Sequence, residues 1–159
     1  MGSEIVRDFM TTEIQTAGVN DSLAHALDIM TEFNIRHLPV LERGKLAGIV
    51  SQRDLFFQEG FRVDPERSRV SEAMTPDPYT VGPDAGLEEV AATMATRKYG
   101  AAVVVEADKA VGIFTTTDAL RALVDLVGRL RASGPVMTAA SPTPPTGSAR
   151  RSTARRATR

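Results

Sequence analysis

Apolar side chains recur at helical spacing in two stretches of the chain. The first stretch, residues 21–33, carries Leu23, Ala26, Leu27, Met30 and Phe33. The second carries Leu87, Val90, Ala91 and Met94. Spacings of three, four and seven residues place such side chains on one face, which predicts an amphipathic helix at each position. Asn20 or Asp21 is suited to cap the first of these helices.

Each predicted helix is followed by two short apolar runs with a polar turn between them. The runs cover residues 38–41 and 46–50 in the first half of the chain, and residues 101–105 and 110–114 in the second. Runs of this length that are rich in β-branched residues are typical of strands rather than helices. The polar turns between them therefore predict two β-hairpins.

A hydroxyl residue followed three positions later by aspartate ends each hairpin. The pairs are Ser51 with Asp54 and Thr115 with Asp118. Because Ser, Thr and Asp side chains satisfy the free amides of a first helical turn, each pair predicts the start of a further helix. The second of these helices carries an apolar face as far as about Arg131; its members are Leu120, Leu123, Val124 and Val127.

The chain repeats itself at an interval of 64 residues without a gap. Residues 6–54 and residues 70–118 share thirteen identical pairs, including Met10 with Met74 and Asp54 with Asp118. Unrelated segments of ordinary composition would share roughly three, so the unit is duplicated. We predict an α+β fold in which two β-α-β-β-α repeats form one pseudo-two-fold module.

The organisation that follows has four parts. Residues 1–57 form the first repeat and residues 69–132 the second, with a polar linker at residues 58–68. Residues 133–159 are rich in Arg, Pro and Ser, have no apolar period, and are predicted to be disordered.

The motifs resemble the cystathionine β-synthase (CBS) domain family. The specific segments are Arg36 to Val40, which contains Leu-Pro-Val, and Gly48 to Leu55, which contains Gly-Ile-Val-Ser-Gln-Arg-Asp. The resemblance implies a pair of repeats whose two clefts accept adenosine-containing ligands, and modules that associate further. It implies no catalytic residue. It also implies that adenine lies beside main chain at Ile14 to Thr16 or Pro78 to Thr80, and near Pro39 or Val103.

The hydroxyl and aspartate pairs have chemistry of their own. Ser51 or Thr115 and the first amides of the following helix point to one place, where hydrogen bonds and the helix dipole favour a phosphate. The carboxylate of Asp54 or Asp118 can accept from both hydroxyl groups of a ribose. Either aspartate can alternatively be a helix N-terminal acid with no ligand, because that position is favourable in itself.

The two predicted clefts differ in charge. The first repeat places Arg36, His37 and Arg53 near the phosphate position, and arginine binds phosphate bidentately. The second repeat has no cation at the matching positions, which are Gly100, Ala101 and Thr117. We therefore expect the first cleft to prefer phosphorylated nucleotides, and the second to be weaker, more nucleoside-like or empty. A solvated surface role is the alternative for His37.

Composition excludes several classes of function. The chain has no Cys and only two His, so neither a disulfide framework nor a metal cluster is expected, and no catalytic triad is evident. No apolar run is long enough to cross a membrane, and we expect a cytoplasmic protein. The recurring methionines are expected to pack in the core.

Charge is distributed unevenly along the chain. Five arginines follow Gly134 with no acid among them, which leaves fourteen basic residues against 20 acidic ones in the body. The body is therefore no general nucleic-acid binder. An Arg-rich tail can contact nucleic acid or an anionic membrane, but it has no interleaved aromatic residue to stack on bases. Binding to nucleic acid or to a membrane is not expected.

Three functions remain in competition. The first is a non-catalytic regulatory module that binds AMP, ADP or ATP and acts through an unknown effector protein; S-adenosylmethionine and NAD offer the same adenosine. The second is a ligand-independent dimerisation scaffold, a homodimer built on the apolar face that begins at Leu120 together with Phe56 and Phe57. The third is a basic-tailed nucleic-acid adaptor.

Overall fold

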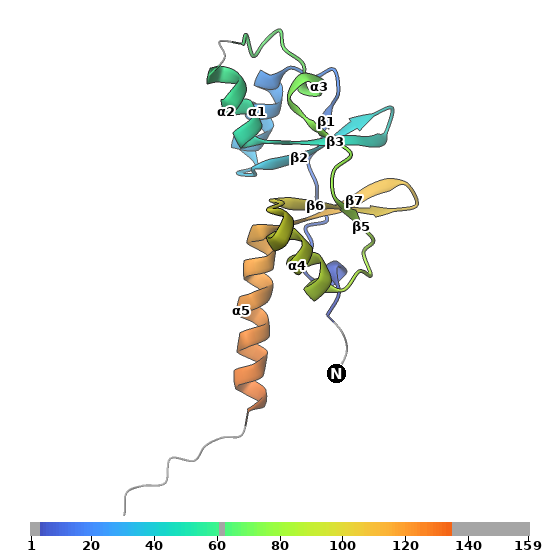
Figure 1. The fold of residues 1–159 in the computed structure, drawn as a ribbon, viewed down its shortest axis with the longest axis vertical. Helices are drawn as coiled ribbons and strands as arrows, with labels where there is room; N and C mark the ends of the chain where they lie inside the picture. Colours follow the sequence, from blue (N-terminus) through green and yellow to red (C-terminus); the bar gives the residue numbers. More distant parts are fainter. Residues whose placement is uncertain (1–3, 61–62, 135–159) are drawn as a thin grey trace, which may run out of the picture.

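The computed structural model describes residues 4–60 and 63–134. It contains two small sheets that lie one above the other, with helices beside each sheet and one long helix, α5, that extends away from the module (Figure 1). The first half holds η1 (Val6–Asp8), β1 (Ala17–Gly18), α1 (Leu23–Glu32), β2 (His37–Glu42), β3 (Lys45–Ser51) and α2 (Gln52–Gly60). The second half holds α3 (Val70–Ala73), β4 (Thr75–Pro76), β5 (Thr80–Val81), α4 (Leu87–Arg97), β6 (Ala101–Glu106), β7 (Lys109–Thr115) and α5 (Thr116–Ser133).

The two sheets have the same construction. In the first, β1 runs parallel to β2 and β2 pairs antiparallel with β3; in the second, β5, β6 and β7 repeat that order. Both hairpins shift register at the same place, between Val40 and Leu41 and between Val104 and Val105. The predicted α+β fold with two repeats is confirmed, and the register shift shows that the repeats match in detail.

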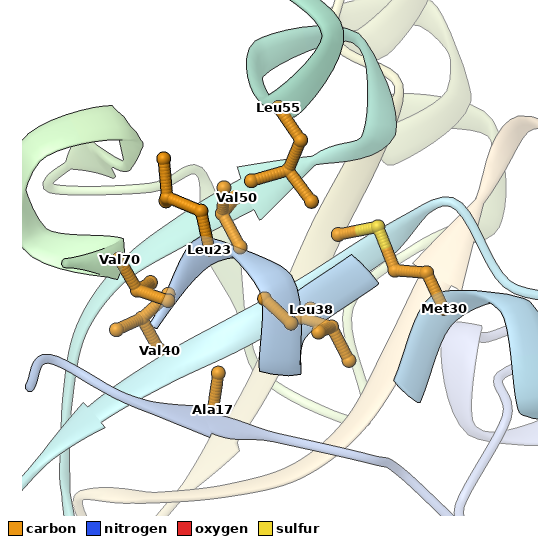
Figure 2. Packing of buried hydrophobic residues seen from close by; sticks show 9 residues of the cluster. Ala17, Leu23, Met30, Leu38, Val40, Val50, Leu55 and Val70 are labelled. Atoms are coloured by element: carbon orange, nitrogen blue, oxygen red, sulfur yellow. The ribbon is translucent and has the colours of Figure 1, made fainter. Parts of the chain in front are cut away.

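The opening segment of each repeat is exchanged with the other repeat. β4 lies in the opening segment of the second repeat but pairs with β3 of the first. Reciprocally, Thr11 lies in the opening segment of the first repeat and bridges to Ile113 in β7. The cores follow the same exchange, because Val70 is buried in the core of the first repeat and Val6 in that of the second. Figure 2 shows Val70 of α3 beside Val40 in the first core.

Glycine makes the exchanged pairing fit. A Cβ atom on Gly48 would lie 2.7 Å from both the Met74 Sδ and the Thr75 carbonyl oxygen. A Cβ atom on Gly112 would lie 2.8 Å from the Met10 Sδ and 3.1 Å from the Thr11 carbonyl oxygen. β3 and β7 therefore each need glycine where the exchanged segment crosses them.

Three sequence predictions of element ends need correction or extension. The cap of α1 is Ser22, whose hydroxyl accepts from the His25 amide at 3.1 Å, and neither Asn20 nor Asp21. Asp21 instead accepts from the Gly18 amide at 2.7 Å, which closes the turn before the helix. α2 continues to Gly60, into the predicted linker, and α5 ends at Ser133. Beyond residue 134, the predicted tail lies outside the described residues.

Candidate functional site

Asp54 and Ser51 form a closed hydrogen-bonded corner where β3 ends and α2 begins. Oδ2 of Asp54 accepts from the Ser51 amide at 2.8 Å and from the Ser51 hydroxyl at 2.7 Å. The Asp54 amide donates back to the Ser51 hydroxyl oxygen at 3.2 Å. This reciprocal arrangement caps the helix. Oδ1 of Asp54 receives no hydrogen bond from any residue that the structure describes.

Asp118 and Thr115 build the same corner at the start of α5. Oδ2 of Asp118 accepts from the Thr115 amide at 2.9 Å and from its hydroxyl at 2.7 Å. Here the second oxygen is also engaged. Oδ1 accepts from the Thr11 hydroxyl at 3.5 Å and from Nη1 of Arg121 at 3.3 Å. The two corners therefore share their cap geometry, and they differ in what engages the outer carboxylate oxygen.

A cleft of about 830 Å³ opens beside Asp54. Both repeats line it, because the exchanged segment after β4 and the loop after α4 lie opposite the start of α2. The first half of the chain contributes Arg36, His37, Ile49, Ser51, Gln52, Arg53, Asp54 and Phe56. The second half contributes Thr75, Asp77, Pro78, Tyr79, Lys98, Tyr99, Gly100 and Ala101.

Six of the residues predicted for a ligand site line this single cleft. They are Arg36, His37, Ser51, Arg53, Asp54 and Pro78. Pro78 comes from the second repeat, so the structure combines the aspartate of one repeat with the opening segment of the other. The hydroxyl of Ser51, expected beside a phosphate, makes its two side-chain hydrogen bonds to Asp54.

The other predicted residues lie outside the Asp54 cleft. Pro39 is buried in β2 opposite Ile49, and Thr80 pairs with Val103 in β5. Ile14 and Thr16 are half-buried in the segment before β1. Thr115, Thr117 and Asp118 lie together at the start of α5, the second corner.

Cations surround the cleft on two sides. Arg36 and Arg53 come from the first repeat and Lys98 from the second, and all three are exposed. The only acidic side chains in the described lining are Asp54 and Asp77. This arrangement favours an anion near a group that binds hydroxyls.

His37 lies at the back of the cleft, against the second repeat. A Cβ atom added to Gly100 would lie only 2.5 Å from Nε2 of His37, so the imidazole fills the space that a side chain would need. Burial lowers the pKa of His37; the Asp54 carboxylate opposes that change and the Arg36 charge adds to it. His37 is therefore biased toward its neutral form.

Sequence reasoning missed six polar or aromatic residues of the cleft. They are Gln52 and Phe56 in the first half of the chain, and Thr75, Asp77, Lys98 and Tyr99 in the second. Tyr79 falls inside the predicted range Pro78 to Thr80, but its side chain was not singled out. Tyr79 and Tyr99 are the two tyrosines of the chain, and their rings stack with centroids 5.4 Å apart and planes at 29°. Comparison of the two repeats offered a signal for the tyrosines. Both stand only in the second repeat, and the matching residues of the first are Gln15 and Ile35.

Among residues 4–60 and 63–134 there is no group of three potential metal ligands. No described helix is long and apolar enough to span a bilayer.

The two repeats exchange their opening segments and share a cleft, which defines a tandem two-domain module. Comparison with known proteins identifies its family. The CBS domain profile matches residues 6–58 and 70–125. The chain belongs to the CBS domain family and carries two copies of the domain. This confirms the resemblance seen in the sequence.

Solved structures extend the comparison. A Vibrio cholerae protein described as an acetoin utilization protein, AcuB, is 34% identical, with a TM-score of 0.76; the match covers 84% of this chain and 100% of that one. CBSX2 from Arabidopsis thaliana, solved with AMP, is 28% identical over 77% of this chain and 98% of that one, with a TM-score of 0.69.

The CBS domain pair of protein MJ0100 was solved with 5′-methylthioadenosine and S-adenosyl-L-methionine. It is 29% identical, has a TM-score of 0.70, and the match covers 76% of this chain and 99% of that one. Relatives of the chain thus bind adenosine compounds with and without a phosphate.

Proposed function

We propose that the chain is a non-catalytic regulatory module that binds a phosphorylated adenosine compound, AMP, ADP or ATP, in the Asp54 cleft. The observation that carries this proposal is the open outer oxygen of Asp54 in a cleft that three cations line. Ribose hydroxyls donate to that oxygen, and the phosphate lies toward Arg36, Arg53 and Lys98. The AMP complex of CBSX2 supports the same ligand class.

Regulation follows from the composition of the cleft. A ligand that contacts residues of both repeats favours the arrangement in which both sets of contacts are made, and it shifts the population by its difference in affinity. An effector protein then responds to this change of arrangement, because the module itself catalyses no reaction.

The test is a thermal unfolding panel with AMP, ADP, ATP, NAD, S-adenosylmethionine and GMP. Ligand at about 100 times its dissociation constant should stabilise the fold by about 2.7 kcal/mol, a midpoint shift of roughly 6–10 °C for a chain of this size. The shift should follow phosphorylated adenine compounds, and fall in Asp54→Ala and Arg36→Ala. Each variant is compared with its own unliganded midpoint.

Arg43→Ala is the matched control, because Arg43 is an exposed arginine in the first hairpin and does not line the cleft. An equal loss in Arg43→Ala would mean that general charge carries the effect. No shift with any nucleotide, in protein freed of bound nucleotide, would contradict the proposal.

A ligand-independent homodimer is the second candidate, and the surface of α5 favours it. Five apolar side chains on this helix are exposed; they are Leu120, Leu123, Val124, Val127 and Leu130. An apolar stripe of this length on one helix suits a symmetric contact between two copies. Light scattering should give twice the chain mass, and Val124→Glu should return the monomer mass. A monomer at all concentrations would dispose of this candidate.

A further inference from the structure

The residue three positions after each corner aspartate differs between the repeats. It is Arg121 after Asp118 and Phe57 after Asp54. On a helix, residues three apart lie on the same side, so an arginine at this position reaches back to the aspartate while a phenylalanine has no group to donate. The second repeat thus has a cation one helical turn after its aspartate, and the first repeat does not.

The arginine engages the oxygen that a ribose would need. Nη1 of Arg121 lies 3.3 Å from Oδ1 of Asp118; the Asp118 side chain is only 4% exposed, and the Arg121 side chain, 73% exposed, covers it from the solvent side. Its other oxygen is committed to the cap through Thr115. A ribose hydroxyl can therefore reach the Asp118 carboxylate only after Arg121 has moved away.

A threonine lies at both corners, so its presence alone does not distinguish them. Thr11 lies by Asp118, and Thr75, its counterpart 64 residues later, lines the cleft beside Asp54. Both repeats therefore supply this hydroxyl, but Thr75 makes no hydrogen bond to Asp54 among the described contacts. The arginine is the group that only the second corner has.

We infer that Arg121 is an internal occupant of the second ribose position and that it restricts the chain to one adenosine ligand, held at Asp54. This inference rests on the proposed function of the Asp54 cleft. Arg121 is then the residue that determines how many ligands the module binds. The second corner instead serves as a structural contact between the Thr11 segment and α5.

The experiment is isothermal titration of the full chain with AMP and with adenosine, which needs no phosphate contact. The wild type should bind one ligand per chain, and Arg121→Phe, which copies the first repeat, should bind two. Arg129→Ala is the control; Arg129 is also on α5 and pairs with Glu4 and Asp125, away from Asp118. It should keep one site.

The reciprocal variant, Phe57→Arg, should weaken binding at the Asp54 cleft by at least tenfold. Circular dichroism and the unfolding midpoint report whether each variant is folded. Two sites per chain in the wild type, or one site in folded Arg121→Phe, would overturn the inference and leave the proposed function standing. No binding by the wild type would overturn the proposed function itself, and this inference with it.

Discussion

The corners at Asp54 and Asp118 are the same structure used in two ways. Both aspartates cap the following helix through one oxygen, with hydrogen bonds that agree within 0.1 Å in length. Asp54 lines a cleft and its outer oxygen accepts no hydrogen bond from the described residues, whereas that of Asp118 is held by Thr11 and Arg121. A duplicated motif thus preserves the helix cap in both copies, while single neighbouring residues decide whether the carboxylate is available to a ligand.

The residues around the two corners also differ, in size and in charge. Arg36 and His37 of the first repeat correspond to Gly100 and Ala101 of the second, and all four line the Asp54 cleft. The small residues of one repeat therefore make room for the large ones of the other. Divergence of the copies built one large cleft from both halves.

The largest expected effect tests the exchanged pairing in each repeat. Gly48→Ala should lower the free energy of unfolding by about 2–3 kcal/mol, because the new Cβ meets a backbone carbonyl as well as Met74. Gly112→Ala should cost about 1–2 kcal/mol, since its carbonyl contact is longer. Urea unfolding measures both. Equal losses would mean that the two crossings are equally tight.

The next effect compares the aspartates in the absence of ligand. Asp118→Ala should destabilise the fold by about 2 kcal/mol, because it removes a cap and the contacts to Thr11 and Arg121. Asp54→Ala should cost about 1 kcal/mol, the value of a cap alone. Chemical denaturation measures the difference. A larger loss for Asp54→Ala would contradict the assignment of its outer oxygen as unengaged.

A smaller effect depends on pH and exists only in the first repeat. Because burial lowers the pKa of His37 in the folded chain, the unfolded chain takes up this proton first as the pH falls. Stability from neutral His37 is present above the ordinary histidine pKa of about 6.5 and is lost as the pH falls from there through the lowered folded value. His37→Gln should flatten this part of the stability profile, measured as unfolding midpoints from pH 7.5 to 5.

His25 provides the control for that experiment. It is the only other histidine and lies on α1, outside the cleft lining. His25→Gln should leave the slope of the profile unchanged. If His25→Gln removed the slope, the pH dependence would belong to His25, and its assignment to His37 would be wrong.

The smallest effect concerns the hairpin tips. The first turn places Arg43 at a φ of 50° and Gly44 at 78°, whereas the second places Ala107 at 48° and Asp108 at 62°. A two-residue turn of this kind prefers glycine at the second position. Asp108→Gly should raise the free energy of unfolding by about 0.5 kcal/mol, seen as a shift of 1–2 °C by the usual size scaling of about 2–4 °C per kcal/mol. Gly44→Asp should do the reverse.

The sequence predicted most of the fold because periodicity and the repeat carried independent information. The hairpins lie within one or two residues of the predicted runs, and the cap at Thr115 was visible as a hydroxyl and an aspartate three apart. The cap of α1 was misplaced because Asn20, Asp21 and Ser22 are all good caps in sequence. Only the turn at Gly18 occupies Asp21 and leaves the helix to Ser22.

The candidate site was predicted in part. Arg36, His37, Arg53 and Asp54 were placed together because they flank one strand-to-helix corner. Asp77, Lys98 and Tyr99 were missed because they come from the second half of the chain, which meets the first half through contacts such as the pairing of β4 with β3, between segments far apart in the chain. No local pattern reports such a contact. The engagement of Asp118 by Arg121 was also missed, although the spacing of three was present.

The exchange of opening segments has a consequence for how the protein reaches its native state. Each core contains a valine that belongs to the other half of the chain, Val70 in one and Val6 in the other. Neither half is then an independent folding unit, and the native contacts have large sequence separations, which slows folding. We expect one cooperative transition with no populated half-folded intermediate. The same interlocking lets two separately synthesised halves complement each other, or two chains trade halves during refolding.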